Sequence, residues 1–234
     1  MRAEIPLSHN ESRLLKNILA NVSLYRTLDS DQLDKVVRAS RILRPCSGKQ
    51  IVQKDEPTKG IYLVVYGQVR VYFDRKDGAE RTIAILGHDN CFGVPEVILD
   101  RPHLASVEVI SDAMVVMTPR ETLFELAHEN PIFSERLLSC VAHQLYHLMH
   151  DAKRHTLNTA TERLAGFLLR QRAYQSNNTV ELNASKTVIA SKLGISSETF
   201  SRLLHSFSDQ GLIEVHGRHI KILDDKGIAG MQPA

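Results

Sequence analysis

The sequence predicts an α+β fold in which a β-rich roll, one long helix and a compact unit of short helices with a β-hairpin follow one another. Three observations predict it. Short apolar runs punctuated by glycine occupy residues 48–118, helical spacing takes over in residues 120–157, and a helix, a turn, a helix and a hairpin lie within residues 158–234. We place the domain boundaries at residues 1–125, 126–157 and 158–234.

The composition is that of an ordinary globular protein. The chain has 234 residues, 43% hydrophobic and 24% charged, which argues against intrinsic disorder as the main state. Its 29 Lys and Arg against 27 Asp and Glu give a net charge of +2, which does not exclude a local basic patch. No apolar run approaches the roughly 18–20 residues that span a bilayer, and residues 1–10 lack the apolar core of a signal peptide. We therefore expect a cytoplasmic protein with no membrane partner.

Two helices are expected before the roll. Residues 11–43 show helical spacing, and Asp29 or Ser30 can cap the second helix. The strands expected in the roll are residues 61–66, 68–73, 82–86, 105–110 and 114–117. Gly67 separates the first two, and residues 74–78 (Asp-Arg-Lys-Asp-Gly) are expected to form a hairpin turn because Asp-Gly is a strong turn signal. Short strands closed by such turns suggest a barrel or roll.

The long helix carries an apolar seam with steps of three and four residues. The seam consists of Leu138, Val141, Leu145, Leu148 and Ala152. Two heptads suggest a partner helix, whereas a helix that packs only on its own domain gives the same spacing. A second apolar strip of Ala142, Tyr146 and Met149 lies on an adjacent flank. The helix can therefore face its own domain and a second subunit together.

Residues 186–204 are expected to form two helices joined by a turn. Gly194 permits the left-handed backbone of the turn, and Ser196 can cap the second helix. The core between the helices is assigned to Ile189, Leu193, Ile195, Phe200 and Leu203. Two apolar strands then flank residues 216–218 (His-Gly-Arg), as in the wing of a winged helix. The pattern predicts a winged helix-turn-helix, with an interaction-only helical hairpin as the alternative.

The second helix of this motif presents polar side chains away from its apolar face. Arg202 can read guanine through O6 and N7, and Glu198 can accept from cytosine N4 or orient Arg202. A surface ion pair between the two is the alternative. Arg218 and His219 at the hairpin tip can touch backbone phosphate or form a solvated turn.

The chain resembles the CRP/FNR family of bacterial transcription regulators over nearly its whole length. The most specific stretch is residues 197–202 (Ser-Glu-Thr-Phe-Ser-Arg), which is similar to the FNR-type pattern E-x-x-S-R. The CRP-type helix has Arg in place of Ser197 and Gly in place of Ser201. The resemblance implies a cyclic-nucleotide-binding-like jelly roll, a dimerisation helix and a winged DNA-binding domain. It also implies a homodimer on double-stranded DNA, with a TTGAT-like half-site repeated as an inverted pair.

The resemblance assigns roles to individual positions of the motif. We expect base contacts from Ser197, Glu198, Ser201 and Arg202. We expect phosphate contacts from Lys186, Ser196, Thr199 and Arg218. It further implies a contact with RNA polymerase through a charged hairpin, although the same charges describe any solvated loop. The hairpin residues are Asp74, Arg75, Lys76, Asp77, Glu80 and Arg81.

The effector site departs from the cyclic-nucleotide pattern of the family. Nucleotide-binding members carry a Gly-Glu pair and, further on, an Arg-Ser pair. The matching residues here are Gly93-Val94 and His103-Leu104. Because a buried phosphate without a paired cation is unfavourable, we do not expect cAMP as the effector. The residues assigned to the effector pocket are Gly93, Val94, His103, Leu104, Ala105, Leu148 and Met149.

The cysteines give no sign of a metal site. Cys46, Cys91 and Cys140 are too widely spaced for zinc or for a disulfide framework and are interpreted as small apolar residues. Residues 1–45 lack the cysteine cluster of FNR proper, so we expect no iron–sulfur cluster. The chain is then similar to the cluster-free, FNR-like branch, which includes nitric-oxide-responsive regulators of denitrification thought to use haem.

Haem is therefore the candidate cofactor. The candidate ligands are His9, His103 and His147. His143, His147 and His150 share one face of the long helix. This arrangement is also typical of a solvated polar stripe or of a face that packs against the roll.

The alternative function is a ligand-binding regulatory module of this fold that does not act on DNA. No nucleophile–base motif or phosphate-binding glycine loop stands out, so we expect no enzymatic activity.

Overall fold

The computed structural model describes residues 9–74, 78–175 and 178–231. The central residues of the expected hairpin turn, Arg75, Lys76 and Asp77, lie outside this part of the chain. Within it, no helix is both long enough and apolar enough to cross a membrane.

The chain divides into two compact units. The first takes its residues from 1–74 and 84–145, and the second from 75–83 and 146–234. In chain order, the elements that begin before residue 146 are α1 (His9–Ala20), α2 (Ser30–Ala39), β1 (Arg41–Leu43), β2 (Gln50–Val52), β3 (Gly60–Asp74), β4 (Glu80–Leu86), β5 (Cys91–Phe92), α3 (Val94–Leu99), β6 (Ser106–Pro119), α4 (Arg120–Glu129) and α5 (Pro131–Leu157). Helix α5 begins in the first unit and ends in the second.

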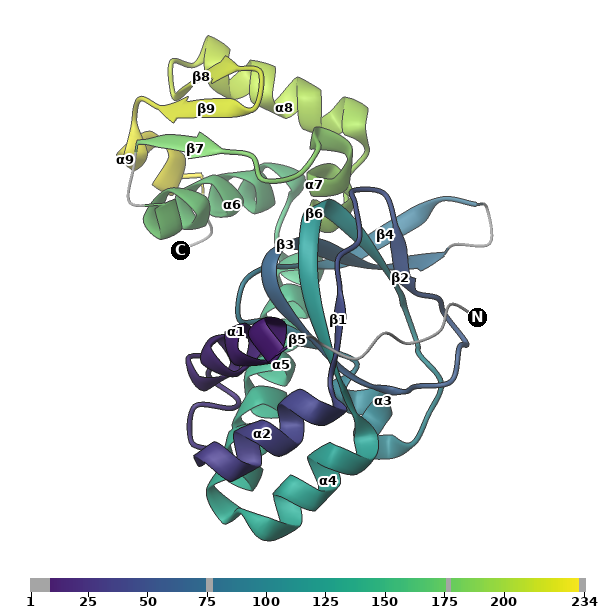
Figure 1. The fold of residues 1–234 in the computed structure, drawn as a ribbon. Helices are drawn as coiled ribbons and strands as arrows, with labels where there is room; N and C mark the ends of the chain where they lie inside the picture. The colour runs from purple at the N-terminus through teal and green to yellow at the C-terminus, as the bar shows by residue number, and fades with distance from the viewer. Residues whose placement is uncertain (1–8, 75–77, 176–177, 232–234) are drawn as a thin grey trace. The chain divides into compact units, whose positions relative to one another are not determined.

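The sheet of the first unit is built on the long pair β3 and β6. These strands run antiparallel from Gly60 opposite Pro119 to Tyr72 opposite Ser106. The strand order is β1-β6-β3-β4, with β2 also paired to β6 and β5 to β3. Figure 1 shows both long strands curving as they cross the unit. The predicted α+β fold with a roll and a winged domain is confirmed.

Two of the predicted strand breaks are wrong. The chain continues through Gly67 as one strand, β3, because this glycine takes a φ of +78° where the register against β6 shifts. An added Cβ at Gly67 would lie 2.3 Å from the carbonyl oxygen of Asp112. The two strands expected at residues 105–110 and 114–117 are likewise a single strand, β6. Gly67 therefore permits a bulge and close strand approach rather than a strand end.

Helix α3 was not predicted from the sequence. It begins after Gly93, whose φ is +80°. Pro95 occupies its first turn, where a backbone N–H has no partner within the helix, so the proline loses no hydrogen bond.

The expected cap on the second helix, α2, is confirmed as Asp29. Its side chain accepts from the amide of Gln32 at 2.8 Å, and the Gln32 side chain accepts from the amide of Asp29 at 3.3 Å.

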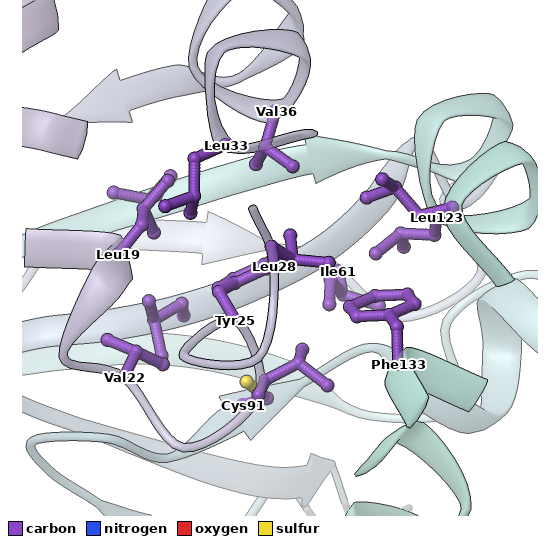
Figure 2. Close-up of a cluster of buried hydrophobic side chains, with 14 of the residues drawn as sticks. Leu19, Val22, Tyr25, Leu28, Leu33, Val36, Ile61, Cys91, Leu123 and Phe133 are labelled. Atoms are coloured by element: carbon purple, nitrogen blue, oxygen red, sulfur yellow. The ribbon is translucent and has the colours of Figure 1, made fainter. Parts of the chain in front are cut away.

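The core of the first unit joins its N-terminal helices to the sheet and to the start of α5. Figure 2 shows Tyr25, Ile61, Leu123 and Phe133 pointing toward one another from four different segments. The rings of Tyr25 and Phe133 stack with their centroids 6.1 Å apart. The Tyr25 hydroxyl lies 2.8 Å from that of Thr118, so its polar end is satisfied inside the core.

The second unit is a winged helix-turn-helix. Its further elements are α6 (Ala160–Gln175), β7 (Thr179–Glu181), α7 (Lys186–Leu193), α8 (Ser197–Asp209), β8 (Ile213–His216), β9 (His219–Ile222) and α9 (Asp225–Ala229). The three strands form a small sheet in the order β7-β9-β8. Of the expected core residues, Ile189, Leu193 and Phe200 are buried, whereas Ile195 and Leu203 are half-buried. Leu204, the next residue on α8, is buried as well.

We expect Gly67→Ala to destabilise the protein more than Gly48→Ala. Both glycines have a positive φ, and a left-handed conformation costs a residue with a Cβ about 1–2 kcal/mol. Only at Gly67 would the methyl group also clash with backbone, whereas nothing lies within 4 Å at Gly48. Urea unfolding followed by circular dichroism measures both losses. Equal losses would contradict the close approach of β3 to β6.

Candidate nucleic-acid interface and effector site

Helix α8 has one buried face and one polar exposed face. Phe200, Leu204 and Phe207 are buried and hold the helix in the second unit. The opposite face carries Ser197, Glu198, Ser201, Arg202 and His205, all exposed. Neither Glu198 nor Arg202 has an ion-pair partner among the residues that the structure describes. Both side chains are therefore available to a ligand.

The turn before α8 has the geometry that its residues predict. Gly194 has a φ of +72°, and its amide donates to the carbonyl of Ala190. The hydroxyl oxygen of Ser196 accepts from the amide of Thr199 at 3.0 Å, which caps the helix. The Ser196 hydroxyl in turn donates to the Thr199 side chain at 2.9 Å. This arrangement presents the N-terminus of a helix, where backbone amides favour an anion.

The remaining expected phosphate contacts lie on other elements of the same unit. Lys186 is the first residue of α7, which Ser185 caps, and its side chain is exposed. Arg218 lies between β8 and β9 at the tip of the wing and is exposed. His219 is exposed beside it, while His216 lies 3.0 Å from the carboxylate of Glu214. Figure 1 shows α7, α8 and the wing as neighbouring parts of this unit.

Helix α5 packs on the first unit through one side and leaves its apolar seam uncovered. Phe133 is fully buried, and Leu137, Cys140 and Val141 pack against the same core. Leu138, Leu145 and Leu148 are between 51% and 68% exposed in the isolated chain. Ala152 of the seam and the flanking residues Ala142, Tyr146 and Met149 are exposed too. Of the predicted seam, only Val141 contributes to the core of its own unit.

The structure places the effector residues in different surroundings. Val94 is fully buried in the core cluster, where it packs with apolar side chains. Leu104 is 65% exposed, and Ala105 is half-buried. Leu148 and Met149 are exposed on α5 and belong to the second unit. Within the first unit, Gly93 and His103 are neighbours, since a Cβ on Gly93 would lie 3.4 Å from the imidazole.

The imidazole of His103 is buried. Its side chain is 4% exposed, and no described group pairs with Nε2. The ring of Tyr62 lies beside it at a centroid distance of 6.1 Å and stacks on Phe92 at 4.8 Å. Burial lowers the pKa of His103, because desolvation disfavours the charged form more than the nearby Glu96 and Glu56 favour it. The imidazole is therefore neutral at pH 7.

The other histidines are exposed. His9 lies at the start of α1, and His147 lies on α5 with His143 and His150. The Tyr146 ring meets that of His150 edge-on at 4.5 Å. In the part of the chain that the structure describes, no three His, Cys, Asp or Glu side chains converge to hold a metal ion.

Two further features bear on the predictions. Asp74 ends β3 and Glu80 begins β4, both exposed, and Arg81 follows on β4. An open cavity of about 490 Å³ lies elsewhere, and none of the expected effector residues lines it. Its lining is Arg41, Thr58, Lys59, Asp100, Met117, Pro119, Arg120 and Glu121.

We expect the buried His103 to make stability depend on pH. With its folded-state pKa lowered from the usual value near 6.5, the folded protein binds fewer protons than the unfolded chain. Stability is therefore lost as the pH falls below about 6.5 toward the folded pKa. His103→Leu should lose less stability than the wild type between pH 7 and 5, measured by urea midpoints. An NMR titration that placed the His103 pKa at or above 6.5 would contradict this.

Comparison with known proteins agrees with this architecture. The family model for the Crp-like helix-turn-helix domain matches residues 162–230, and that for the cyclic nucleotide-binding domain matches residues 45–130. The CRP-like cAMP-activated global transcriptional regulator of Mycobacterium tuberculosis is 23% identical over 220 residues, which cover 92% of this chain and 98% of the relative. Transcriptional activator protein Anr of Pseudomonas protegens is 25% identical over 226 residues, covering 93% and 91%.

A solved structure shows the same arrangement of elements. FixK2 from Bradyrhizobium japonicum matches with a TM-score of 0.75 at 26% identity, covering 83% of this chain and 98% of that chain. The match to the Crp-like domain sets aside the alternative of a regulatory module without DNA function. The protein is thus a DNA-binding transcription regulator of the CRP/FNR type, with a cyclic-nucleotide-binding domain before its helix-turn-helix.

Proposed function

We propose that the protein is a homodimer that recognises a TTGAT-like inverted repeat and responds to an effector in its roll other than cAMP. The observation that carries the proposal is the exposed polar face of α8, with Glu198, Ser201 and Arg202 held above a buried apolar face. This face carries the E-x-x-S-R pattern that resembles the FNR type.

The charges on this face suit direct reading of base edges. The guanidinium of Arg202 can donate two hydrogen bonds to guanine, and the carboxylate of Glu198 can accept from cytosine. Ser197 and Ser201 flank them on the same exposed face. The helix N-terminus at Ser196 and Thr199, with Lys186 and Arg218, would fix the register on the phosphates.

The exposed seam of α5 supports a dimer. Leu138, Leu145 and Leu148 repeat at near-heptad spacing and are each more than half exposed in the isolated chain. A contiguous apolar stripe of this kind marks an interaction surface, and the same stripe on a second copy is self-complementary about a two-fold axis. A two-fold dimer matches the symmetry of an inverted repeat.

No residue expected to form the effector pocket offers a charge that pairs with a phosphate. Of the expected pocket residues only His103 can titrate, and burial keeps it neutral at pH 7. Transfer of the cAMP phosphate to such a site would be unfavourable. His103 Nε2 could hold a haem iron, but because the side chain is buried, the surrounding residues would have to open to admit haem.

An effector can control the protein only if it binds two states with different affinity. Helix α5 connects the two units without a break, so an effector that shifts its start would act on the rest of the helix. Haem as cofactor and the polymerase contact through the hairpin at residues 74–81 stay predictions.

We expect the effector-free protein to prefer a duplex bearing TTGAT-N4-ATCAA over a scrambled duplex at the same salt concentration. Fluorescence anisotropy measures both affinities, and salt is held constant because phosphate contacts are strongly salt-dependent. Added cAMP should leave both unchanged. If both duplexes bind weakly and equally, and haem with nitric oxide creates no preference, the half-site is wrong.

Two arginine variants separate base reading from phosphate contact. Arg202→Ala should cost about 1–3 kcal/mol on the specific duplex and relax preference at one base pair. Arg218→Ala should weaken binding to both duplexes similarly and reduce the salt slope by about 1. An equal loss on both duplexes for Arg202→Ala would make Arg202 a phosphate contact.

We expect Leu145→Glu to shift the protein toward monomer. The change places a charge in the exposed seam of α5, where it would be buried against the second copy. Leu99→Glu is the matched control, because Leu99 is 67% exposed at the end of α3, away from the seam. Sedimentation velocity at several concentrations gives the oligomeric state. Dimerisation that survives Leu145→Glu unchanged would place the interface elsewhere.

A further inference from the structure

Two of the three cysteines meet inside the first unit, although 49 positions separate them in the sequence. Cys91 lies on β5 and is buried in the hydrophobic core, where Figure 2 shows its sulfur among apolar side chains. Cys140 lies on α5, is half-buried and packs against the same core. Cys46 is exposed.

The contact between the two cysteines is specific. The two thiols lie close enough to shift each other's pKa. The side-chain amide of Gln144, one helical turn after Cys140, donates to the carbonyl oxygen of Cys91 at 3.0 Å and contacts the Cys140 sulfur at 3.6 Å. One side chain thus holds the strand and the helix in the position that brings the sulfurs together. A disulfide between the two cysteines requires that their Cβ–S groups approach each other in this packed region.

The two thiols differ in accessibility and in pKa. The approach of the Cys91 thiol, helped by the nearby His143 and Gln144, lowers the pKa of Cys140 more than burial raises it. The approach of Cys140 and burial both raise the pKa of Cys91. Since the thiolate is the reactive form, Cys140 is the reactive member and is also the one that solvent reaches.

We propose that Cys140 and Cys91 form a peroxide-reactive site that closes to an intramolecular disulfide between α5 and β5. The Cys140 thiolate attacks one oxygen of hydrogen peroxide, an S–O bond forms, the O–O bond breaks, and hydroxide leaves and takes up a proton as water. Cys91 then attacks the sulfenic sulfur, the S–S bond forms, and the S–O bond breaks with release of a second water. Two thiols are oxidised to one disulfide and one peroxide is reduced to two waters.

This site is separate from the DNA-reading face and does not depend on the proposed half-site. The disulfide would tie the β5 strand covalently to the part of α5 that packs on the roll. It would close a loop of roughly 50 residues, which is long enough to constrain the unfolded chain substantially. Oxidised protein should therefore unfold at a higher temperature than reduced protein.

The test uses the full-length protein, reduced, freed of thiol reagent and treated with one equivalent of hydrogen peroxide. Peptide mapping by mass spectrometry after alkylation should find the Cys91–Cys140 linked peptide in the wild type and equally in the matched control Cys46→Ser. Cys91→Ser should stop at the sulfenic acid, which dimedone traps on Cys140. Cys140→Ser should form neither product, and circular dichroism checks that each variant is folded.

The alkylation rate of each thiol gives a second readout that does not need a variant. Iodoacetamide should modify Cys140 at pH 7 at least several-fold faster than Cys91. Oxidation mainly at Cys46, a disulfide only between chains, or a dimedone adduct on Cys91 in place of Cys140 would each overturn the proposal. So would Cys91 that is alkylated faster than Cys140 in the reduced wild type.

Discussion

The burial of Phe133 against Tyr25 is the contact on which the working arrangement of the first unit depends. It joins the start of α5 to the N-terminal helices and the sheet in one core. Because Phe133, Leu137, Cys140 and Val141 occupy the side that faces this core, the leucine seam must point away from it. One packing contact therefore determines which face of α5 is left for a second copy of the chain.

The elements that the sequence predicted well carry their own local signals. Asp29 caps α2, Gly194 takes the left-handed turn, and Ser196 caps α8, each through contacts within a few residues. Gly67 was misinterpreted because a glycine in a β region signals a strand end and a bulge equally well. Only the partner strand β6, more than forty residues later, decides between the two. Likewise, whether Leu203 or Leu204 is buried depends on how α8 packs in its unit, which the spacing alone does not determine.

The DNA-reading face was easier to predict than the effector pocket, for a physical reason. An exposed helix face is the complement of its buried face, and both follow from one periodicity. The pocket instead depends on side chains from separate elements. Val94 matched a pocket position in sequence, but helix α3 places it in the core. The pairing of Cys91 with Cys140 depends on the packing of α5 against β5, so spacing rules written for local metal motifs could not detect it.

The first unit places two chemically different groups where each could act on the same helix. His103 offers a neutral imidazole beside Tyr62 and Gly93, close in the chain to α3, whose Val94 and Val97 belong to the core that α5 also joins. Cys140 lies on α5 itself, one turn before Gln144, which donates to the carbonyl of Cys91 on β5. A ligand at His103 must alter the packing of that core to affect α5, whereas a bond at Cys140 would restrain the helix without an intermediary. A ligand at His103 and a disulfide at Cys140 would therefore control the helix in different ways. A noncovalent ligand shifts the equilibrium between two conformations of the protein only as far as its affinities for them differ. A disulfide holds one conformation until a reductant breaks it.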